Sequence, residues 1–319
     1  MRPKFWYQWD PTADVRARIE PIADIIPNGP LDQLPGVTAI CIGNIIDANG
    51  ELMDKVGPSL KVIARPGIGV DNVNIADASE RGILVINTPD APTESTAEHA
   101  VALLMAVAKR VTTGHTWSQT RNGPRTIMLG TEMKGRTLGL LGFGRIGRRV
   151  GEICSMGLKM NVIVYDPYLS HEQAAAVNVT PVASMDDVLE QSDFVSMHTP
   201  YLPETHHMIS DAQLSKMKPG SYLINASRGP ILDEQALVRA LESGHLGGAA
   251  LDVFEIEPPE MDNPLLTMPN VVATPHTASY TTAGVHAMQH GVTDQLIQIL
   301  NGEKPPFLVD PNIWPGRAG

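Results

Sequence analysis

A series of six short apolar runs, beginning at residue 137, places the strongest constraint on the fold of this chain. The series starts with TLGLLG (137–142) and continues through NVIVYD, DFVSMHT, SYLINAS, GGAALDV and NVVATPH. Each run has the length of a buried strand and is followed by an amphipathic segment, which is the pattern of parallel strands connected by helices. This part of the chain therefore predicts a complete α/β domain with a doubly wound sheet.

The first hundred residues predict a second sheet. KFWYQW, VTAICIG, LKVIAR and ILVIN have strand character, and TAEHAVALLMAVAKR (96–110) predicts a long helix with one apolar face. A chain of 319 residues also exceeds the length at which a single core is common. The helix expected within AGVHAMQHGVTDQLIQILNG has no strand partner of its own, so we expect it to pack on the first sheet. We therefore predict a domain of residues 105–281, inserted in a domain of residues 1–104 and 282–319.

The turn after the first of the six runs contains a glycine motif. LGLLGFGRIGRRV places Gly142, Gly144 and Gly147 in the spacing G-x-G-x-x-G, between a strand and a helix. The first glycine permits a tight turn, the second lets backbone N–H groups approach a pyrophosphate, and the third lets the helix pack on the strand. Asp166 ends the next strand, where an acid accepts hydrogen bonds from ribose hydroxyls and repels a 2′-phosphate. The motif predicts a dinucleotide site, with an ordinary βα turn as the alternative, and Asp166 favours NAD over NADP.

The composition argues against several other classes of function. The net charge of -11 disfavours a nucleic-acid partner, because a phosphate backbone attracts basic surfaces. Cys41 and Cys154 lie too far apart in the sequence for a paired metal or redox motif, so we expect reduced thiols and no metal site. The N-terminus lacks a signal-peptide apolar core and no run of 18 apolar residues follows, which predicts a cytoplasmic protein with no membrane partner. We expect the one basic cluster, Arg145, Arg148 and Arg149, to meet a small anionic ligand or solvent.

Three later segments each contain reactive side chains just after a strand. INASRGPILDEQAL supplies Arg228, whose guanidinium can bind a carboxylate and a neighbouring carbonyl, although a surface arginine near a helix start is the alternative. ATPHTASY supplies His276, a residue type suited to proton transfer because its usual pKa is near neutrality. For His198 and the pair His206-His207 we expect structural or surface roles. LDVFEIEPPE supplies four acids, one of which could orient the imidazole: Asp252, Glu255, Glu257 and Glu260.

Together these motifs resemble the D-isomer-specific 2-hydroxyacid dehydrogenases, a family that includes glyoxylate/hydroxypyruvate reductases and 3-phosphoglycerate dehydrogenases. The resemblance extends from about residue 50 to 302 and includes LKVIARPGIGVDNVNIADASERGILVINTP, STAEHAVALLMAVAKR, HTPYLPET, INASRGPILDEQALVRALESG, GAALDVFEIEPP and NVVATPHTA. It implies an α/β fold with two doubly wound parallel-sheet domains, a Rossmann NAD-binding domain inserted in a flavodoxin-like substrate domain. It also implies a homodimer in which the long helix near residues 96–120 packs against the twofold mate.

The resemblance implies roles for individual residues. Arg228 is similar to the substrate-binding arginine, Glu257 to the partner of the catalytic histidine, and His276 to the acid/base. Ile68 and Gly69 resemble a loop whose backbone N–H groups bind the substrate carboxylate. Asp252 resembles the acid that hydrogen-bonds the nicotinamide amide. The implied cofactor contacts are Gly142, Gly144, Arg145, Ile146, Gly147, Asp166, Thr199, Pro200, Ala226, Ser227, Asp252 and Ala278.

The implied activity is reversible hydride transfer between NADH and a 2-oxo acid, and the sequence bears on which acid. The phosphoglycerate-specific branch usually has an arginine after the strand that here is AICIG, whereas this chain has Gly43 and Asn44, although Arg65 is present. We therefore favour glyoxylate or hydroxypyruvate over the alternative, a 3-phosphoglycerate dehydrogenase. An alternative of another class is a non-catalytic, NAD-sensing protein similar to a corepressor, which would not require the combination of Arg228, Glu257 and His276.

Overall fold

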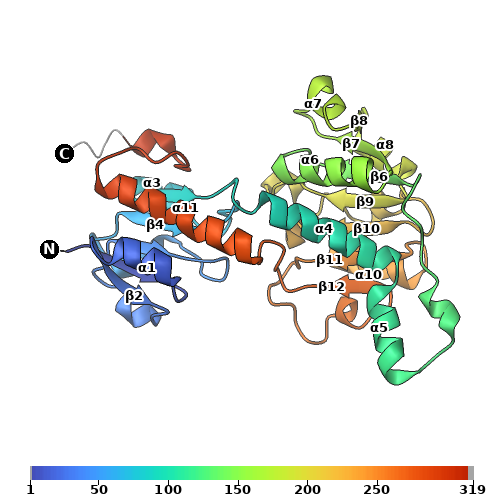
Figure 1. Ribbon diagram of the computed structural model, residues 1–319, viewed down its shortest axis with the longest axis horizontal. Coiled ribbons are helices and arrows are strands. Elements are labelled where there is room, and N and C mark those ends of the chain that lie inside the picture. The colour runs from blue at the N-terminus through green and yellow to red at the C-terminus, as the bar shows by residue number, and fades with distance from the viewer. Residues whose placement is uncertain (1, 315–319) are drawn as a thin grey trace. The chain divides into compact units, whose positions relative to one another are not determined.

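The structure is a computed structural model that describes residues 2–314, and the chain divides into two compact units (Figure 1). Unit 1 contains the residues up to Pro92 together with those from Thr281 onward, and unit 2 is Thr93–Tyr280. The insertion of one α/β unit in another is therefore a property of the structure as well as of the sequence.

Unit 1 is built on a parallel sheet of five strands in the order β2-β1-β3-β4-β5. This order is the flavodoxin-like one, which agrees with the predicted fold class. The strands are β1 Lys4–Tyr7, β2 Asp24–Pro27, β3 Ala39–Cys41, β4 Val62–Arg65 and β5 Leu84–Asn87. The helices are α1 Ala13–Ile19, α2 Gly50–Val56, α3 Ile75–Glu80 and α11 Thr282–Leu300, with short 3-10 turns at Leu31–Gln33 and Pro311–Ile313.

The C-terminal helix α11 packs on β4, β5 and α1 of unit 1. Its Val292 and Leu296 are each 1% exposed and belong to the same apolar cluster as strands β4 and β5. Gln295 is also buried, and its amide is paired at both ends: Nε2 donates to Asn87 O (2.8 Å) and Oε1 accepts from Phe307 N–H (3.1 Å). A buried amide with both groups paired fixes the position of α11 on the sheet at little desolvation cost.

Unit 2 is built on a parallel sheet of seven strands in the order β12-β11-β10-β9-β6-β7-β8. Numbered within the unit this is 7-6-5-4-1-2-3, the Rossmann order with one further strand, so the predicted fold class is confirmed. The strands are β6 Thr137–Leu141, β7 Asn161–Tyr165, β8 Thr180–Pro181, β9 Phe194–Met197, β10 Tyr222–Asn225, β11 Gly248–Leu251 and β12 Val271–Ala273.

Helices cover both faces of this sheet (Figure 1), and the sheet lies between two apolar clusters. The helices are α4 Thr93–Ala108, α5 Val111–Thr120, α6 Arg145–Glu152, α7 His171–Ala175, α8 Met185–Gln191, α9 Asp211–Leu214 and α10 Glu234–Glu242. Shorter turns are the 3-10 turns Arg125–Met128, Pro203–Thr205, Gly229–Ile231 and Pro264–Leu266 and the π-helical turn Ile153–Gly157.

Helix α4 belongs to unit 2 because it packs on β10, β11, β12 and α6. The compact units therefore divide between Pro92 and Thr93, twelve residues before the boundary predicted at residue 105. The assignment of residues 1–104 and 282–319 to substrate binding, and of 105–281 to the dinucleotide, concerns function and stays a prediction.

Two strands were not predicted from the sequence. β2 (DIIP) lies at one edge of its sheet and ends at a proline, and β8 is a two-residue edge strand that also contains a proline. Edge strands need no continuous apolar run, because one side of the backbone lacks a partner strand, and proline is tolerated there. Among the described residues, no helix combines the length and the apolar character needed to cross a membrane.

Candidate active site

In unit 2 the predicted functional segments all follow the carboxyl ends of parallel strands, so they lie along one edge of the sheet. The glycine motif follows β6, Asp166 follows β7, Thr199 follows β9, and Arg228, Asp252 and His276 follow β10, β11 and β12. Strands β6 and β9 are neighbours from which the strand order runs outward in opposite directions. This reversal is where doubly wound sheets bind ligands.

Each glycine of the motif has the geometry that its predicted role requires. Gly142 has φ +94°, and a Cβ there would lie 2.7 Å from His198 O. A Cβ on Gly147 would lie 2.4 Å from Gly142 O, so helix α6 packs closely on the turn. Gly144 is the N-cap of α6, and a Cβ there would meet no atom within 4 Å. The turn therefore leaves open space at the helix N-terminus, where a pyrophosphate could approach.

Asp166 contacts the glycine turn directly. Its Oδ2 accepts a hydrogen bond from Phe143 N–H (2.7 Å), and its Oδ1 accepts one from Tyr168 N–H (2.8 Å). These bonds fix the carboxylate beside Gly142 and Gly144, and each oxygen keeps a further acceptor position for a hydroxyl group.

Thr199 offers an independent test of whether a dinucleotide fits here. Its backbone N would lie 3.0 Å from a Cβ on Gly142, so the turn after β9 contacts the glycine turn after β6. Within the described part of the chain, Thr199 Oγ1 is buried and has no hydrogen-bond partner. A buried hydroxyl without a partner is costly unless a ligand or water pairs with it. The open glycine turn, the adjacent acid and this hydroxyl together fit a nucleotide cofactor.

The basic cluster at α6 is only partly as expected. Arg149 forms ion pairs with Glu94 on α4 and Glu152 on α6, at 2.8 Å each. The two carboxylates raise the pKa of the Arg149 guanidinium. Arg149 therefore links two helices, and the prediction that it meets a small anion or solvent is wrong, whereas Arg145 and Arg148 are exposed at the helix start.

His276 is paired with Glu257, the one of the four acids that the resemblance implies as its partner. His276 Nδ1 lies 2.6 Å from Glu257 Oε2, and Glu257 Oε1 accepts a hydrogen bond from Phe254 N–H (3.1 Å). Glu255 instead accepts a bond from Glu234 N–H at the start of α10 (2.8 Å). A carboxylate on Nδ1 orients the ring and leaves Nε2 as the atom that can exchange a proton with a ligand.

The loop that contains His276 is organised by Asp252, which is 1% exposed. Asp252 Oδ1 accepts hydrogen bonds from Thr274 Oγ1 (2.6 Å) and Thr277 N–H (2.9 Å), and Oδ2 accepts one from Ala278 N–H (2.9 Å). Burial disfavours the charged form, but the ring of His99 and these donors outweigh it and lower the pKa of Asp252 below its usual value. The backbone also contributes, since His276 N–H donates to Asp252 O (2.7 Å).

These bonds hold His276 in a backbone conformation that the residue would seldom adopt alone. Its φ is +52°, in the left-handed region that side chains other than glycine rarely occupy. Such conformations persist where the surroundings determine them and are common in functional sites.

Arg228 is placed by a close contact between two loops. Arg228 immediately precedes Gly229, and a Cβ on Gly229 would lie 1.8 Å from Phe254 O. Only glycine permits this approach of the turn after β10 to the loop that contains Glu257. Arg228 Nη1 donates to Ser227 O (2.6 Å), Asn225 Nδ2 donates to Arg228 O (3.0 Å), and the side chain is partly exposed.

The three histidines for which structural or surface roles were expected have contacts that fit those roles. His198 Nε2 lies 2.9 Å from Ser196 Oγ, and burial lowers the pKa of His198 to about 4, so the ring is neutral near pH 7. The rings of His206 and His207 stack at 4.1 Å near the surface.

The remaining predicted cofactor contacts lie on the same loops. Ala226 is buried, Ser227 N–H donates to Asn225 Oδ1 (3.0 Å), and Pro200 is exposed and accepts a hydrogen bond from Thr205 Oγ1 (2.9 Å) at its carbonyl. Ile146 is partly buried in the first turn of α6.

In unit 1, the predicted substrate loop is fixed by side chains from its own sheet. Asn87 Nδ2 donates to Ile68 O (2.7 Å), and Gly67 N–H donates to Thr88 Oγ1 (2.8 Å). Arg65 Nη1 donates to Pro66 O (2.7 Å), just before this loop. These contacts define the path of Ile68 and Gly69 within unit 1.

The sequence did not indicate three features of the site: His99, Thr274 and the close approach at Gly229. His99 on α4 places Nε2 3.3 Å from Asp252 Oδ1 and 3.0 Å from Thr274 Oγ1. The available signal was a lone imidazole within the apolar stretch of a long helix, which is ambiguous without its tertiary partners.

Several known proteins are similar to this chain in sequence. Residues 101–278 match the family model described as D-isomer specific 2-hydroxyacid dehydrogenase, NAD binding domain. A D-3-phosphoglycerate dehydrogenase from Archaeoglobus fulgidus is 41% identical over 249 residues, which are 78% of this chain and 47% of that protein. A glyoxylate reductase from Korarchaeum cryptofilum is 41% identical over 265 residues, 81% of this chain and 79% of that protein.

A solved structure is similar over nearly the whole chain. The D-lactate dehydrogenase from Aquifex aeolicus complexed with NAD and lactic acid has a TM-score of 0.85 and 28% identity, covering 96% of this chain and 98% of that one. The chain spans about half the length of the phosphoglycerate dehydrogenases that it matches.

The contacts of Asp252 predict that Asp252→Asn destabilises the loop at residues 274–278. An amide nitrogen would replace one acceptor oxygen and face a backbone N–H, so we expect the free energy of unfolding to fall by roughly 1.5–3 kcal/mol. Denaturant unfolding followed by fluorescence measures this change. Asp262→Asn, at an exposed position, is the control and should leave stability unchanged; equal stability of both variants would contradict the prediction.

The lowered pKa of His198 predicts a loss of stability in acid. Between about pH 6.5 and 4 the unfolded chain binds a proton at this residue that the folded chain does not, so the unfolding free energy falls as the pH falls through this window. Denaturation at several pH values should show a shallower fall for His198→Gln than for the unsubstituted protein. Parallel curves for His198→Gln and the unsubstituted protein would refute the assignment.

Proposed function

Since this chain belongs to the D-isomer specific 2-hydroxyacid dehydrogenase family, we propose that it is an NAD-dependent dehydrogenase that interconverts a small 2-oxo acid and its D-2-hydroxy acid. The observation that carries this proposal is the 2.6 Å contact of His276 Nδ1 with Glu257 Oε2, on a loop that touches the turn after Arg228. A proton carrier and a guanidinium are the two groups that this reaction needs from the protein.

The proposed roles follow from the chemistry of each side chain. NAD, when bound, supplies or accepts the hydride. His276 Nε2 donates a proton to the substrate oxygen as the 2-oxo group is reduced and removes it in the reverse direction. Glu257 orients the ring through Nδ1, and Arg228 binds the substrate carboxylate and the adjacent oxygen through its fork of N–H donors. The backbone N–H groups of Ile68 and Gly69 also bind the carboxylate.

For the cofactor we propose that the pyrophosphate binds at the N-terminus of α6, where Gly144 leaves open space. Asp166 binds the ribose hydroxyls, which selects NAD over NADP. Ala278 N–H takes one acceptor position of Asp252 Oδ2, and the nicotinamide amide takes another. The complete proposed set of cofactor contacts is Gly142, Gly144, Arg145, Ile146, Gly147, Asp166, Thr199, Pro200, Ala226, Ser227, Asp252 and Ala278.

Glyoxylate and hydroxypyruvate are the favoured substrates because Gly43 and Asn44 offer no cation at the end of β3. Gly43 N–H is bound by Gln8 Oε1 (2.6 Å) and Gly43 O by Asn72 Nδ2 (2.8 Å), so this turn is fixed in place. The alternative, 3-phosphoglycerate dehydrogenase, has equal support from the comparisons, since relatives of both names reach 41% identity. Substrate choice therefore rests on the residues at this turn.

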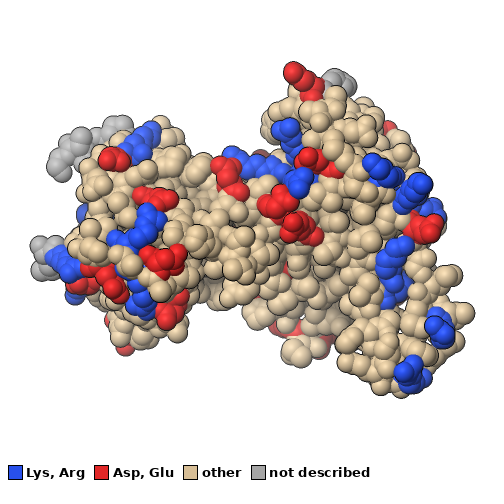
Figure 2. Space-filling view, viewed as in Figure 1, with Lys and Arg blue, Asp and Glu red and all other residues tan. Residues whose placement is uncertain are grey.

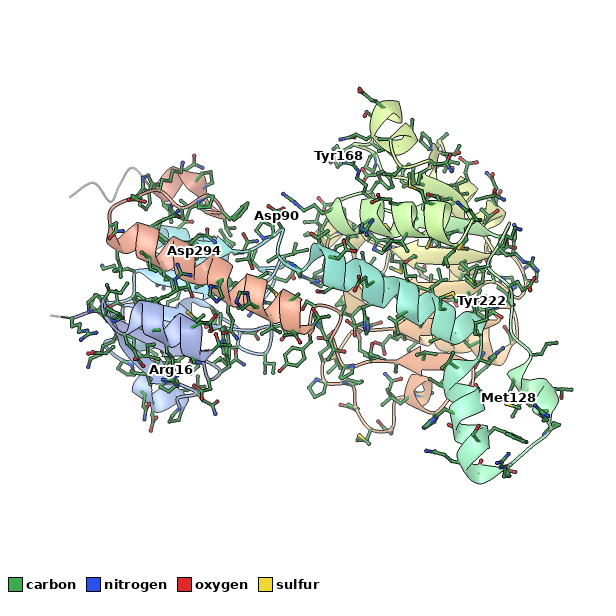
Figure 3. All side chains as sticks on the ribbon, viewed as in Figure 1. Arg16, Asp90, Met128, Tyr168, Tyr222 and Asp294 are labelled. Atoms are coloured by element: carbon green, nitrogen blue, oxygen red, sulfur yellow. The ribbon has the colours of Figure 1, made fainter. Side chains whose placement is uncertain are left out.

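We further propose a homodimer in the cytoplasm. Helix α5 has no buried residue, and its first residue, Val111, is 55% exposed. In the segment that follows α5, Ile127 is 44% and Leu129 84% exposed. Helix α5 and this segment extend away from the sheet of unit 2 (Figure 1), and Met128 lies beside α5 (Figure 3). An exposed apolar arm fits a subunit interface. Cys41 and Cys154 are free and buried, which suits a reducing compartment.

Replacement of His276 tests the catalytic proposal. His276→Ala should reduce kcat by about 10²–10⁴-fold, the range expected for loss of a general acid/base, while NADH still binds. Turnover is followed by NADH absorbance, and binding by NADH fluorescence. His206→Ala, at an exposed position, should retain full activity. An unchanged kcat in His276→Ala would reject the role of this residue, and NADH binding without turnover in the unsubstituted protein would favour the NAD-sensing alternative.

A comparison of three substrates tests the choice of acid. We expect kcat/KM with NADH to be higher for glyoxylate or hydroxypyruvate than for 3-phosphohydroxypyruvate. Asn44→Arg should shift the preference toward the phosphorylated substrate, because it restores a cation at the end of β3. A clear preference of the unsubstituted protein for 3-phosphohydroxypyruvate would reverse the assignment.

A further inference from the structure

A cluster of two histidines and an aspartate lies on unit 1, between helices α1 and α11. Asp14 is in the first turn of α1, and His286 and His290 are one turn apart on α11. One potential ligand atom from each residue lies within 4.8 Å of the others. His286 Nε2 is 3.3 Å from Asp14 Oδ2, His290 Nε2 hydrogen-bonds the same oxygen, and the two imidazole rings stack at 4.0 Å.

The positions of these side chains follow from the packing of the two helices. Residues four apart on a helix project from the same face, which aligns the two imidazoles. Beneath them the apolar residues Val15, Ile19, Val292 and Leu296 are 0–1% exposed and join α1 to α11. The backbones that carry the cluster are therefore fixed, while the side chains are open to solvent: 47% exposed for Asp14, 60% for His286 and 23% for His290.

The spacing of His286 and Asp14 suits a tetrahedral transition-metal ion, whereas the hydrogen bond between His290 and Asp14 must lengthen to admit one. Zn²⁺ binds imidazole nitrogen and carboxylate oxygen at about 2.0–2.2 Å, which places neighbouring ligand atoms about 3.3–3.5 Å apart in a tetrahedron. The His286 Nε2 to Asp14 Oδ2 distance of 3.3 Å matches this spacing. Two imidazoles and a single carboxylate favour Zn²⁺ over Ca²⁺ and Mg²⁺, which prefer oxygen ligands throughout.

We propose that Asp14, His286 and His290 bind one Zn²⁺ ion, with solvent as the fourth ligand. Because the ligands come from both α1 and α11, the bound ion crosslinks the first helix of unit 1 to its last one and stabilises that unit. The proposal does not depend on the dehydrogenase activity. The cysteine spacing predicted no metal site; His286 and His290 have the spacing of two ligands on one helix face, but Asp14 joins them only through the fold.

Arg18 gives the proposal a distinctive consequence. Its Nη1 is 3.1 Å from His290 Nδ1, and its Nη2 pairs with Asp294, which is labelled on α11 in Figure 3. Acidic and basic side chains lie next to one another over these helices, at the left of Figure 2. A guanidinium only donates, so His290 Nδ1 is the acceptor and Nε2 has the proton. Zn²⁺ binding at Nε2 requires the proton on Nδ1 instead, so Arg18 must turn away.

The test is a titration of the metal-free full chain with Zn²⁺ by calorimetry. We expect one ion per chain, an affinity at least tenfold weaker in Asp14→Asn, His286→Gln and His290→Gln, and a tighter affinity in Arg18→Met. His115→Gln, on the exposed face of α5, is the matched control and should bind Zn²⁺ as the unsubstituted chain does. His276→Gln should also bind one ion, which separates this cluster from the His276–Glu257 pair.

Two further measurements complete the test. The absorption spectrum of Co²⁺ in place of Zn²⁺ should have the intensity of a tetrahedral site with nitrogen ligands. Saturating Zn²⁺ should raise the melting temperature of the unsubstituted chain, but not that of His286→Gln, whose metal-free melting temperature should be unchanged because His286 is exposed. Equal Zn²⁺ affinity and stoichiometry in the unsubstituted chain and all three ligand variants would overturn the proposal.

Discussion

The buried carboxylate of Asp252 is the constraint on which the geometry of the candidate active site depends. A carboxylate that is 1% exposed would be strongly unfavourable without hydrogen-bond donors. Those donors come from Thr274, Thr277 and Ala278, so the charge is satisfied only when the loop around His276 has closed over it. The same closure gives His276 its positive φ and directs its ring toward Glu257. The hydrogen bonds that stabilise the buried charge of Asp252 thus determine the position of His276.

The parallel topology of unit 2 explains why these residues can meet at all. All seven strands run in one direction, so the segments that follow them lie along one edge of the sheet. Glycines then let the loops approach one another more closely than any side chain would allow. Gly142 brings the dinucleotide turn against Thr199, and Gly229 brings the turn after Arg228 against the loop of Glu257. The sheet supplies the convergence and the glycines supply the close contacts.

Much of the fold was predictable because it is encoded locally. Continuous apolar runs such as VIAR and YLIN indicate strands that are covered on both faces, and both are buried strands here. The edge strands β2 and β8 were not predicted, because a strand with one free side and a proline lacks that run. The unit to which α4 belongs was also not predictable. Its apolar face is evident in the sequence, but only the packing shows that it covers β10, β11 and β12 of unit 2. The ion pair of Arg149 was not predictable for the same reason, since its partner Glu94 is 55 residues away.

By itself the sequence determined the two α/β units, the glycine turn with its acid, and the identity of the residue types that could carry out proton transfer and bind a carboxylate. These features depend on local periodicity and on short spacings within one strand, turn or helix. Only the tertiary structure decided that His99 and Thr274 surround Asp252, and that Asp14 meets two histidines of the last helix. The physical reason is that these contacts join side chains distant in the chain, whose proximity is set by the register and packing of the sheets and helices between them.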